Sequence, residues 1–326
     1  MKVSVIIPVF NTAPWLDRCL DAVLRQTLSD IEILCIEDGS TDESGSILEK
    51  RAARDSRIRI LSFGENRGAA ASRNAGLDAA GGEYVYFLDS DDWMDPDYLE
   101  AMVLRAEKTG GDVVINRSYI LEWEDGRQAP AFPAGFVRGD GYYTPAVVSG
   151  WFLPALWTRL YRRSYLKDND IRFPDDLRCA EDIYFTGLAE VLQRRSYLFT
   201  GPMYHYFQRE GSLSRASESR FRALQNYDRL FDALVMRGYP VSDLRLFYAG
   251  PDLRVDTEEK FLFLRRFFHK IAPLVREHAG WYFGFDKLLL DAVTESASYG
   301  DFQQRYGANY IADFIRNARR VSPSKP

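Results

Sequence analysis

Short apolar runs alternate with helix-like segments in the N-terminal part of the chain, and this alternation restricts the fold more than any other feature. Residues 3–7, 31–36, 58–61 and 84–88 are β-branched or aromatic runs of strand length. The segments between them carry apolar residues at the spacing of helices or are rich in alanine. This order predicts an α/β fold: a Rossmann-like, doubly wound and mostly parallel sheet, flanked by helices and joined by right-handed crossovers.

Two details predict the boundaries of these elements. Pro8 interrupts the first apolar run, so we expect the first strand to stop there. Ser40 and Glu43 have the spacing of a capping box, which predicts a helix that begins beside them.

Candidate ligand-binding residues follow three of the predicted strands. Residues 8–11, Asp38, and the pair Asp89 and Asp91 come directly after apolar runs. The carboxyl ends of parallel strands meet at one edge of a sheet, and ligands bind there. We therefore expect these residues to converge on one ligand site.

Asp89, Asp91 and Asp92 lie within four positions of one another, although neighbouring like charges give a strand no stability. Carboxylate oxygens suit Mg²⁺ or Mn²⁺, which complete their shell with water and substrate phosphates. The alternative is an acidic turn before a helix that has Asp95 as N-cap and Pro96 at its first position. The convergence at one sheet edge favours the metal site.

The composition is that of an ordinary globular protein. The 326 residues are 46% hydrophobic, which suffices for one large domain or two. A net charge of −5 provides no global basic surface, so we expect no nucleic-acid partner. The three cysteines are widely separated and indicate neither a zinc site nor a disulfide framework. The N-terminal apolar run is too short for a signal peptide, and no later run reaches the length of a membrane span, so we expect a cytoplasmic protein.

Four segments, taken in order, resemble the family-2 glycosyltransferases. They are VSVIIPVFN at 3–11, EDGSTD at 37–42, NRG at 66–68 followed by Arg73 and Asn74, and LDSDD at 88–92. Each segment alone is weak, but the combination is highly specific, and the resemblance covers about the first two-thirds of the chain. It implies the GT-A fold and an inverting, metal-dependent enzyme that uses a nucleotide-diphosphate sugar.

The resemblance also implies roles for residues at the sheet edge. Asp38 would hydrogen-bond the uracil imide of a UDP-sugar, and Asp89 and Asp91 would be the D-x-D site for Mn²⁺ or Mg²⁺. The family commonly has an aspartate where this chain has Glu37, and we expect the change to be tolerated because Asp38 is the residue that meets the base. The expected nucleotide-binding residues are Pro8, Val9, Phe10, Asn11, Asp38, Asn66, Arg73, Ser90, Arg209 and Ser212.

An acidic pair, Glu181 and Asp182, begins a later helical pattern. Two carboxylates at a helix start commonly complement the helix dipole. In the family, however, an E-D pair lies here, often after a glycine where this chain has Ala180, and its aspartate is the general base. The resemblance thus implies that Asp182 deprotonates the acceptor hydroxyl, as inverting transfer requires. Glu181 would orient the acceptor or a neighbouring group.

Three further residues are candidates, and two of them, Trp157 and His205, have a packing alternative. Trp157 could stack on an acceptor sugar, although aromatic residues in such density more often pack in a core. His205 could complete the metal shell or contact phosphate, or it could simply be hydrogen-bonded in the core. Arg209 and Arg215 flank a Gly/Ser-rich segment that resembles the family's loop over the nucleotide, so one or the other could neutralise diphosphate charge.

The sequence changes character near residue 216. We expect a catalytic domain at 1–215, with a nucleotide-binding half (1–116) and an acceptor-binding half (117–215), followed by a mostly helical region at 216–326. The helical region has an apolar stripe beside basic residues. It could pack on the catalytic domain, form a homo-oligomer, or make peripheral contact with the inner face of a membrane, where lipid-linked acceptors reside.

These features together predict an enzyme that moves a sugar from a UDP-sugar to a hydroxyl of a glycan or lipid-linked acceptor, in surface polysaccharide or glycan assembly. One alternative is a sugar-nucleotide pyrophosphorylase, but that class needs a Gly-rich phosphate loop where this chain has residues 8–11. The other is an inactive nucleotide-binding scaffold, which the intact carboxylates disfavour.

Overall fold

The computed structural model describes residues 1–130, 140–143, 155–174, 176, 180–193, 196–209, 219–239, 254–277, 284–308 and 310. The chain divides into two compact units, Met1–Ser212 and Leu213–Pro326. Each unit has its own cluster of buried apolar side chains.

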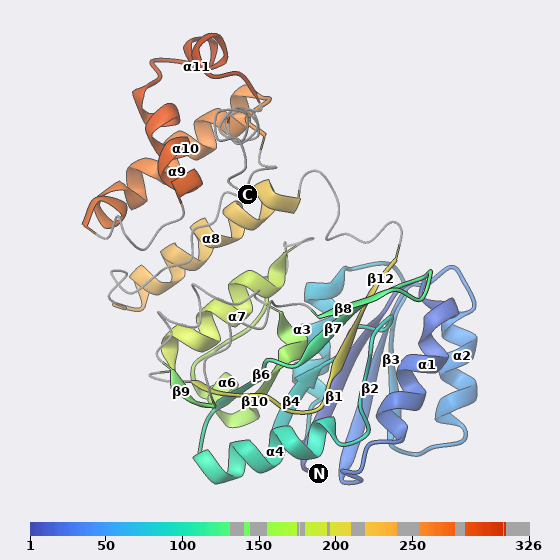
Figure 1. Ribbon diagram of the computed structural model, residues 1–326. Helices are drawn as coiled ribbons and strands as arrows, with labels where there is room; N and C mark the ends of the chain where they lie inside the picture. Colours follow the sequence, from blue (N-terminus) through green and yellow to red (C-terminus); the bar gives the residue numbers. More distant parts are fainter. Residues whose placement is uncertain are drawn as a thin grey trace, which may run out of the picture. The chain divides into compact units, whose positions relative to one another are not determined.

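A mixed sheet forms the centre of the first unit (Figure 1). Among the described residues, eight strands pair in the order β3-β2-β1-β4-β10-β6-β11-β9. They are β1 (Val3–Val9), β2 (Ile31–Asp38), β3 (Ile58–Phe63), β4 (Tyr84–Phe87), β6 (Val113–Asn116), β9 (Gly141–Tyr143), β10 (Arg159–Arg162) and β11 (Ser196–Phe199). The predicted parallel half is confirmed, because β1 pairs in parallel with β2 and β4, and β2 with β3. β10 enters between β4 and β6 and is antiparallel to both.

Helices cover both faces of this sheet. They are α1 (Ala13–Leu24), α2 (Ser44–Ala52), α3 (Ala69–Ala79), α4 (Tyr98–Thr109), α6 (Arg163–Asp168) and α7 (Glu181–Leu192). Alternate residues of β1 point to opposite faces. The odd-numbered ones from Val3 to Val9 pack in one cluster with α1, α2 and α4. On the other face, a Cβ atom added to Gly76 of α3 would collide with the Ile6 side chain, so glycine allows α3 to lie close to β1.

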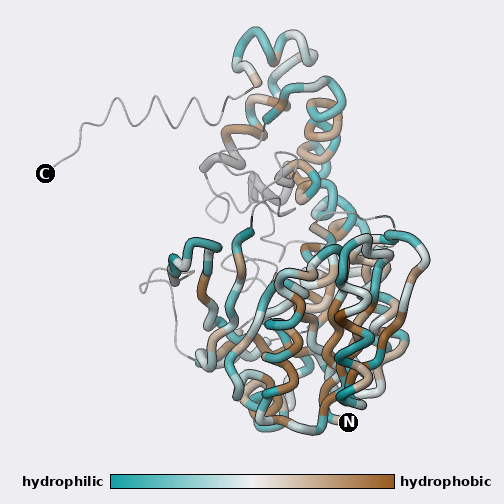
Figure 2. Tube along the Cα trace, turned by 90° about the vertical axis from the view of Figure 1, so that its right-hand side faces the viewer, coloured by the Kyte–Doolittle hydropathy of each residue, from teal (hydrophilic) through white to brown (hydrophobic). Residues whose placement is uncertain are grey.

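The second face also carries an aromatic cluster that anchors α7. Phe185 of α7 stacks on Phe173 with ring centroids 4.2 Å apart, and it meets Phe87 of β4 and Tyr161 of β10 edge-on at 5.4 and 5.3 Å. Such buried ring contacts add about 0.5–1.5 kcal/mol each to the burial of the rings themselves. Figure 2 shows the strands at the centre among the most hydrophobic segments of the chain.

A smaller sheet contains β5 (Trp93–Met94), the strand that follows β4 in the chain. Among the described residues its strands are β5, β7 (Tyr119–Trp123), β8 (Gln128–Pro130) and β12 (Tyr204–Gln208), in the order β5-β12-β7-β8. β12 is antiparallel to β5 and parallel to β7. β5 directly follows the D-x-D residues, so this sheet connects them to segments far along the chain.

Two of the predicted boundaries are wrong, namely the end of β1 and the start of α2. β1 runs past Pro8 to Val9. Pro8 is tolerated because β1 pairs with β4 only as far as Ile6, so the missing amide lies beyond the doubly paired part of the strand. Helix α2 begins at Ser44 rather than beside Ser40, because the Ser40 hydroxyl accepts a hydrogen bond from the Asn11 amide instead.

The helix expected to begin at Asp95 and Pro96 also begins later, at Tyr98. Asp95 exchanges hydrogen bonds with the Met203 backbone, donating from its amide and accepting on its carboxylate and so extending the pairing of β5 with β12. The chain can turn into α4 only after this pair. The acidic-turn alternative therefore does not describe Asp95.

The second unit is helical in its described part. Its helices are α8 (Ser219–Met236), α9 (Glu258–Glu277), α10 (Gly284–Glu295) and α11 (Tyr299–Arg305). The apolar face of α9, including Phe261, Leu264 and Phe268, is buried in the cluster of this unit. Lys270 of α9 pairs with two aspartates of α8, one of them Asp232 at 2.6 Å. None of the described helices combines the length and apolarity needed to cross a membrane.

Candidate active site

The loops after β1 and β2 are tied together by side-chain hydrogen bonds. Asn11 has a φ of 52°, a left-handed conformation that asparagine tolerates better than most residues. Its Oδ1 accepts the Thr41 amide at 2.8 Å, and its own amide donates to Ser40 Oγ at 3.2 Å. Phe10 beside it is 41% exposed, whereas Val9 is buried. Residues 8–11 thus form a loop that hydrogen bonds hold in place, with the aromatic ring of Phe10 open to solvent.

Asp38 is buried and holds the next loop. Its two carboxylate oxygens accept the backbone amides of Arg67 and Gly68, at 2.7 and 2.9 Å. Asn66 precedes these amides in the same turn. Gly39 has a φ of 70°, and a Cβ there would lie 2.7 Å from the Glu65 carbonyl carbon, so only glycine permits this approach. The predicted nucleotide residues after β2 and β3 are therefore brought together.

Arg73 connects the D-x-D segment to the acidic pair of α7. It extends from α3 and is buried. One of its terminal nitrogens, Nη2, donates to Asp89 Oδ1 at 2.8 Å, and the other, Nη1, pairs with Glu181 Oε1. Asp89 lies 16 positions after Arg73 in the sequence and Glu181 lies 108 positions after it, and both side chains meet on one guanidinium. Sequence reasoning placed Arg73 beside the nucleotide but did not anticipate the contact with Glu181.

The three aspartates after β4 have different surroundings. Asp91 accepts from Arg209 Nε at 2.6 Å, and Asp89 pairs with Arg73. Burial and the neighbouring Asp89 charge raise the pKa of Asp91, with Arg209 opposing that shift. Ser90 between them is buried.

Asp92 is fully buried and has a structural role. It accepts the Tyr204 hydroxyl at 2.6 Å and the Phe207 amide at 2.7 Å, which joins the segment after β4 to β12. Its burial raises the pKa of its carboxyl well above the usual range. Asp92 is thus the member of the triplet that the fold itself requires.

The donor set of Asp89 and Asp91 fits a divalent cation. Two half-buried carboxylates stand one residue apart, and their mutual repulsion is met by Arg73 and Arg209. Mg²⁺ and Mn²⁺ bind through one or two carboxylates, with water and phosphate as further ligands. Among the residues that the structure describes, no group of three or more His, Cys, Asp or Glu side chains is placed to hold a metal ion.

Glu181 and Asp182 begin helix α7 after a strained residue. Ala180 at the N-cap has a φ of 55°, in the left-handed region that favours glycine. Asp182 is partly exposed, and its Oδ1 accepts the Ile183 amide at 2.9 Å. Burial, reinforced by the Glu181 charge, raises the pKa of Asp182 to about 7. A carboxylate with such a pKa can accept a proton near neutral pH.

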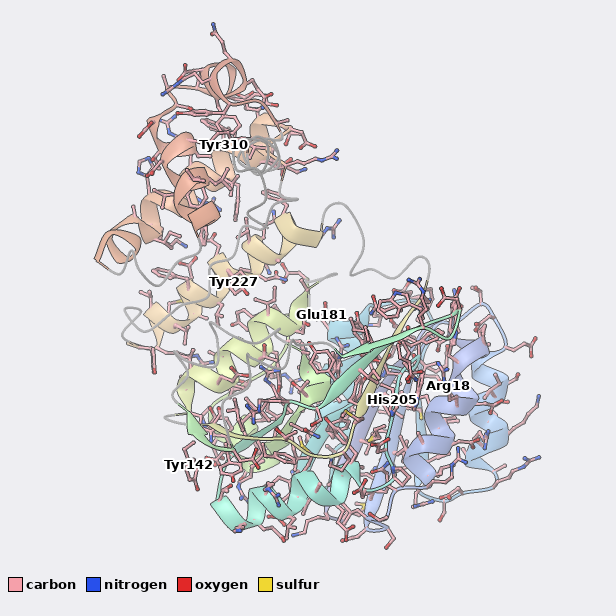
Figure 3. All side chains as sticks on the ribbon, in the orientation of Figure 1. Arg18, Tyr142, Glu181, His205, Tyr227 and Tyr310 are labelled. Atoms are coloured by element: carbon pink, nitrogen blue, oxygen red, sulfur yellow. The ribbon has the colours of Figure 1, made fainter. Side chains whose placement is uncertain are left out.

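His205 belongs to β12 of the small sheet (Figure 3). Its ring stacks on Trp93 with centroids 5.1 Å apart. Its Nδ1 is 2.6 Å from Glu122 Oε1, and its Nε2 is 3.1 Å from Asp95 Oδ1. Both ring nitrogens therefore have carboxylate partners other than the D-x-D residues. Its role as a metal ligand stays a prediction, to which these contacts lend no support.

Trp157 is 6% exposed and lies in the core of the first unit. Its ring stacks on Tyr204 with centroids 4.4 Å apart, and its backbone carbonyl accepts the hydroxyls of Tyr86 and Tyr98. These contacts match the packing alternative rather than an open acceptor platform. Ser212, the last predicted nucleotide residue, lies outside the described residues.

The sequence reading missed Arg18, whose Nη2 donates to the Asp91 carbonyl at 3.2 Å. It also missed the partners of Asp92. The position of Arg18 on a predicted amphipathic helix was the available signal, but a helical pattern does not reveal which loop a polar side chain will meet.

The arrangement brings the predicted site residues Asp38, Arg73, Asp89 and Asp91 to the carboxyl edge of a Rossmann-like sheet, with Glu181 joined to Asp89 through Arg73. Residues 4–168 match the family model for glycosyl transferase family 2. Because this match spans half of the chain, the chain belongs to glycosyl transferase family 2.

Known proteins with similar sequences include two bacterial glycosyltransferases. The chain is 31% identical over 256 residues to the glycosyltransferase GlyA of Streptococcus pneumoniae, covering 74% of this chain and 36% of GlyA. It is 35% identical over 224 residues to the cholesterol galactosyltransferase of Borreliella burgdorferi, covering 65% of this chain and 62% of that protein. The chain thus spans less than two thirds of the length of either relative.

Solved structures show the same fold. S. aureus TarS 1–349 in complex with UDP-GlcNAc superimposes with a TM-score of 0.68 at 23% identity, covering 98% of this chain and 92% of that one. TarS 1–349 in complex with UDP gives a TM-score of 0.67 at 22% identity, with the same coverage. The predicted GT-A fold with a helical C-terminal extension is confirmed by this likeness.

Proposed function

We propose that the chain is an inverting, metal-dependent glycosyltransferase that moves a sugar from a UDP-sugar to an acceptor hydroxyl. The observation that carries this proposal is the double ion pair of Arg73, which holds Asp89 and Glu181 on one buried guanidinium. A diphosphate at Asp89 and a hydroxyl at Asp182 would then lie on two sides of the same side chain. Transfer needs this proximity of donor and base.

The donor base would lie at the edge formed by residues 8–11 and Asp38. Each oxygen of Asp38 has one backbone donor, and a carboxylate oxygen can accept a second hydrogen bond, here from the uracil imide. Phe10, being half exposed, would cover one side of the base. The TarS structures with UDP and UDP-GlcNAc support the choice of nucleotide.

Asp89 and Asp91 would hold Mn²⁺ or Mg²⁺, which would neutralise charge on the departing diphosphate. Arg209 pairs with Asp91 at 2.6 Å, and it would pair with those phosphates instead once the donor is bound. The buried Arg73 remains as a fixed positive charge behind the site.

Asp182 would act as general base. It takes the proton of the acceptor hydroxyl while the acceptor oxygen bonds to the anomeric carbon and the bond from that carbon to the diphosphate oxygen breaks, releasing UDP. Attack from the face opposite the diphosphate inverts the anomeric configuration. A pKa of about 7 matches this task, because a substantial fraction of the carboxyl is ionised at neutral pH and the carboxylate is still basic enough to accept the proton.

The acceptor would be a glycan or lipid-linked sugar of a surface polysaccharide. The support comes from names of relatives, among them the succinoglycan biosynthesis protein ExoO of Rhizobium meliloti, which is 28% identical over 225 residues. We further propose a catalytic domain at 1–215 and a helical region at 216–326 that mediates self-association or peripheral contact with the inner face of the membrane, in a cytoplasmic protein.

Donor hydrolysis by the purified chain tests the proposal. UDP release from UDP-sugars should require Mn²⁺ or Mg²⁺ and stop on chelation. Asp91→Ala should abolish turnover and remove the Mn²⁺-dependent thermal stabilisation by UDP. Turnover by Asp91→Ala in the presence of a chelator would refute the metal assignment, and binding of UDP without any sugar transfer or hydrolysis would favour a scaffold.

A further inference from the structure

Arg18 of α1 contacts two aromatic rings of the small sheet, whose centroids lie 5.9 Å apart and whose planes are tilted by 51° to each other. The central carbon of its guanidinium lies 3.5 Å from the ring centroid of Trp93 and 4.5 Å from that of Phe207. Trp93 belongs to β5 and Phe207 to β12, so one side chain joins α1 to two strands. The Trp93 ring also stacks with the ring of His205, so Arg18 and His205 both contact it.

The same guanidinium contacts the D-x-D turn through the backbone. Nη2 of Arg18 donates to the carbonyl oxygen of Asp91 at 3.2 Å. The thiol of the next residue, Cys19, lies 3.6 Å from the carbonyl oxygen of Asp89. Consecutive residues of α1 therefore hold the backbone carbonyls of both D-x-D aspartates.

Arg18 differs in this respect from the other two arginines at the site. Arg73 and Arg209 pair with carboxylate oxygens of Asp89 and Asp91, which are the atoms that a cation would use. Arg18 binds a carbonyl and leaves both carboxylates available. Its contact can thus persist whether or not the carboxylates hold a metal.

Stability alone does not explain an arginine at this position. Burial lowers the pKa of Arg18, despite the nearby charges of Glu122 and Asp92. Within the described residues, its buried Nε has no hydrogen-bond partner. An apolar side chain could contact both rings without this desolvation cost.

We propose that Arg18 is a positioning residue for the metal-diphosphate site, fixing the 89–92 turn so that the Asp89 and Asp91 carboxylates are presented together. The inference rests on the proposed function, because it requires a cation at these two aspartates. The planar guanidinium supplies both parts of the role, since it lies against both rings and donates to the Asp91 carbonyl of the turn.

Mn²⁺ binding measures this role directly. Mn²⁺ would be titrated into the full chain with saturating UDP, and free Mn²⁺ followed by electron paramagnetic resonance, for wild type, Arg18→Gln and Arg18→Lys. Loss of a residue that orients metal ligands weakens metal affinity by about 10–100-fold, and we expect this range for Arg18→Gln. Arg18→Lys should also bind Mn²⁺ more weakly than wild type, because an ammonium cannot reproduce the planar contacts.

Arg51→Gln is the matched control. Arg51 of α2 forms ion pairs with Asp17 and Asp21 on the same helix α1, at 2.7 and 2.8 Å, without contacting the D-x-D turn. It should lower the melting temperature without changing the Mn²⁺ dissociation constant. A purely structural role for Arg18 would make its variants behave in the same way, which would overturn the inference.

The direction in which Mn²⁺ affinity changes distinguishes a positioning role of Arg18 from an effect of its charge alone. Arg18 is a cation beside two metal-binding carboxylates, so if only its charge mattered, Arg18→Gln would bind Mn²⁺ more tightly and Arg18→Lys would match wild type. Either result overturns positioning. If Arg18→Gln does not fold, Arg18→Lys against wild type decides alone. Absence of Mn²⁺ binding by wild type overturns the proposed function together with this inference, whereas wild-type binding with unchanged Arg18 variants overturns this inference only.

Discussion

Replacing Asp182 with asparagine should make the protein more stable at neutral pH while removing most of its activity. The pKa of this carboxyl lies at about 7, against an ordinary value of 3.8. The folded state therefore binds the proton more tightly than the unfolded state does. The resulting stabilisation is complete below pH 3.8 and is lost as the pH rises through about 7.

The size of the effect follows from the same numbers. At about 1.36 kcal/mol per pKa unit, full ionisation of Asp182 removes roughly 4 kcal/mol of stability, of which about 2.5 kcal/mol is lost between about pH 5 and about pH 8. Solvent at the partly exposed carboxylate reduces this, so we expect about 1–2.5 kcal/mol. Asparagine does not ionise. The stability of Asp182→Asn relative to wild type should thus rise by that amount across this range.

The assay measures the melting temperatures of wild type and Asp182→Asn at about pH 5 and about pH 8, together with the kcat of both proteins. For a domain of this size, 1 kcal/mol corresponds to roughly 2–4 °C in melting temperature. The asparagine variant should lose about 10²–10⁴-fold in kcat, as for removal of a general base. Wild-type kcat should rise with pH through about 7 as the base ionises.

Glu181→Gln is the natural comparison, because it changes the neighbouring carboxylate and should have the opposite effect on stability. It breaks a buried ion pair with Arg73, which typically costs about 3–5 kcal/mol, while lowering kcat less than Asp182→Asn. Simple dipole complementation would instead lower stability by about 0.3–1 kcal/mol in both variants and leave kcat nearly unchanged. An Asp182→Asn protein that is less stable than wild type at pH 8 and keeps its kcat would refute the reasoning.

Two further substitutions and one comparison of ligands test separate parts of the structure. Asp92→Ala leaves the Tyr204 hydroxyl and Phe207 amide without their partner, so urea unfolding should show a loss of about 2–4 kcal/mol, and a loss below about 0.5 kcal/mol would contradict the buried contacts. Ala180→Gly relieves a left-handed alanine and should raise stability by up to about 1 kcal/mol, whereas a lower melting temperature would show that the residue is not strained. Calorimetry should show UDP binding at least about tenfold tighter than ADP, because Asp38 would lack the imide partner in ADP, and equal affinities would exclude that contact.

The parallel half of the fold was accessible from the sequence because local patterns determine it. The apolar runs from Val3 to Phe87 predict strands whatever the distant chain does, and strand order places Asp38 and Asp89 at one edge. The insertion of β10 between β4 and β6 was not accessible. It joins segments more than 70 residues apart through strand pairing that no local pattern encodes.

The site shows the same division. The motif residues Asp89 and Glu181 were found by their neighbours in sequence, but their connection through Arg73 depends on how α3 packs. Trp157 and His205 show why residue type alone decides little. A tryptophan or histidine is equally suited to a ligand site and to a core, and only burial and contacts distinguish the two.

The antiparallel β10 also affects how the chain can fold during synthesis. β4 ends at Phe87, and the strand that covers its free edge is completed only at Arg162, about 75 residues later. At about 5–20 residues per second, the ribosome needs roughly 4–15 s to supply it. During that time the nascent chain presents the edge of β4, a strand of buried aromatic and aliphatic residues, to any other unfinished strand. A chain arrested before Arg159 would keep that edge open and would be prone to pair with another copy of itself.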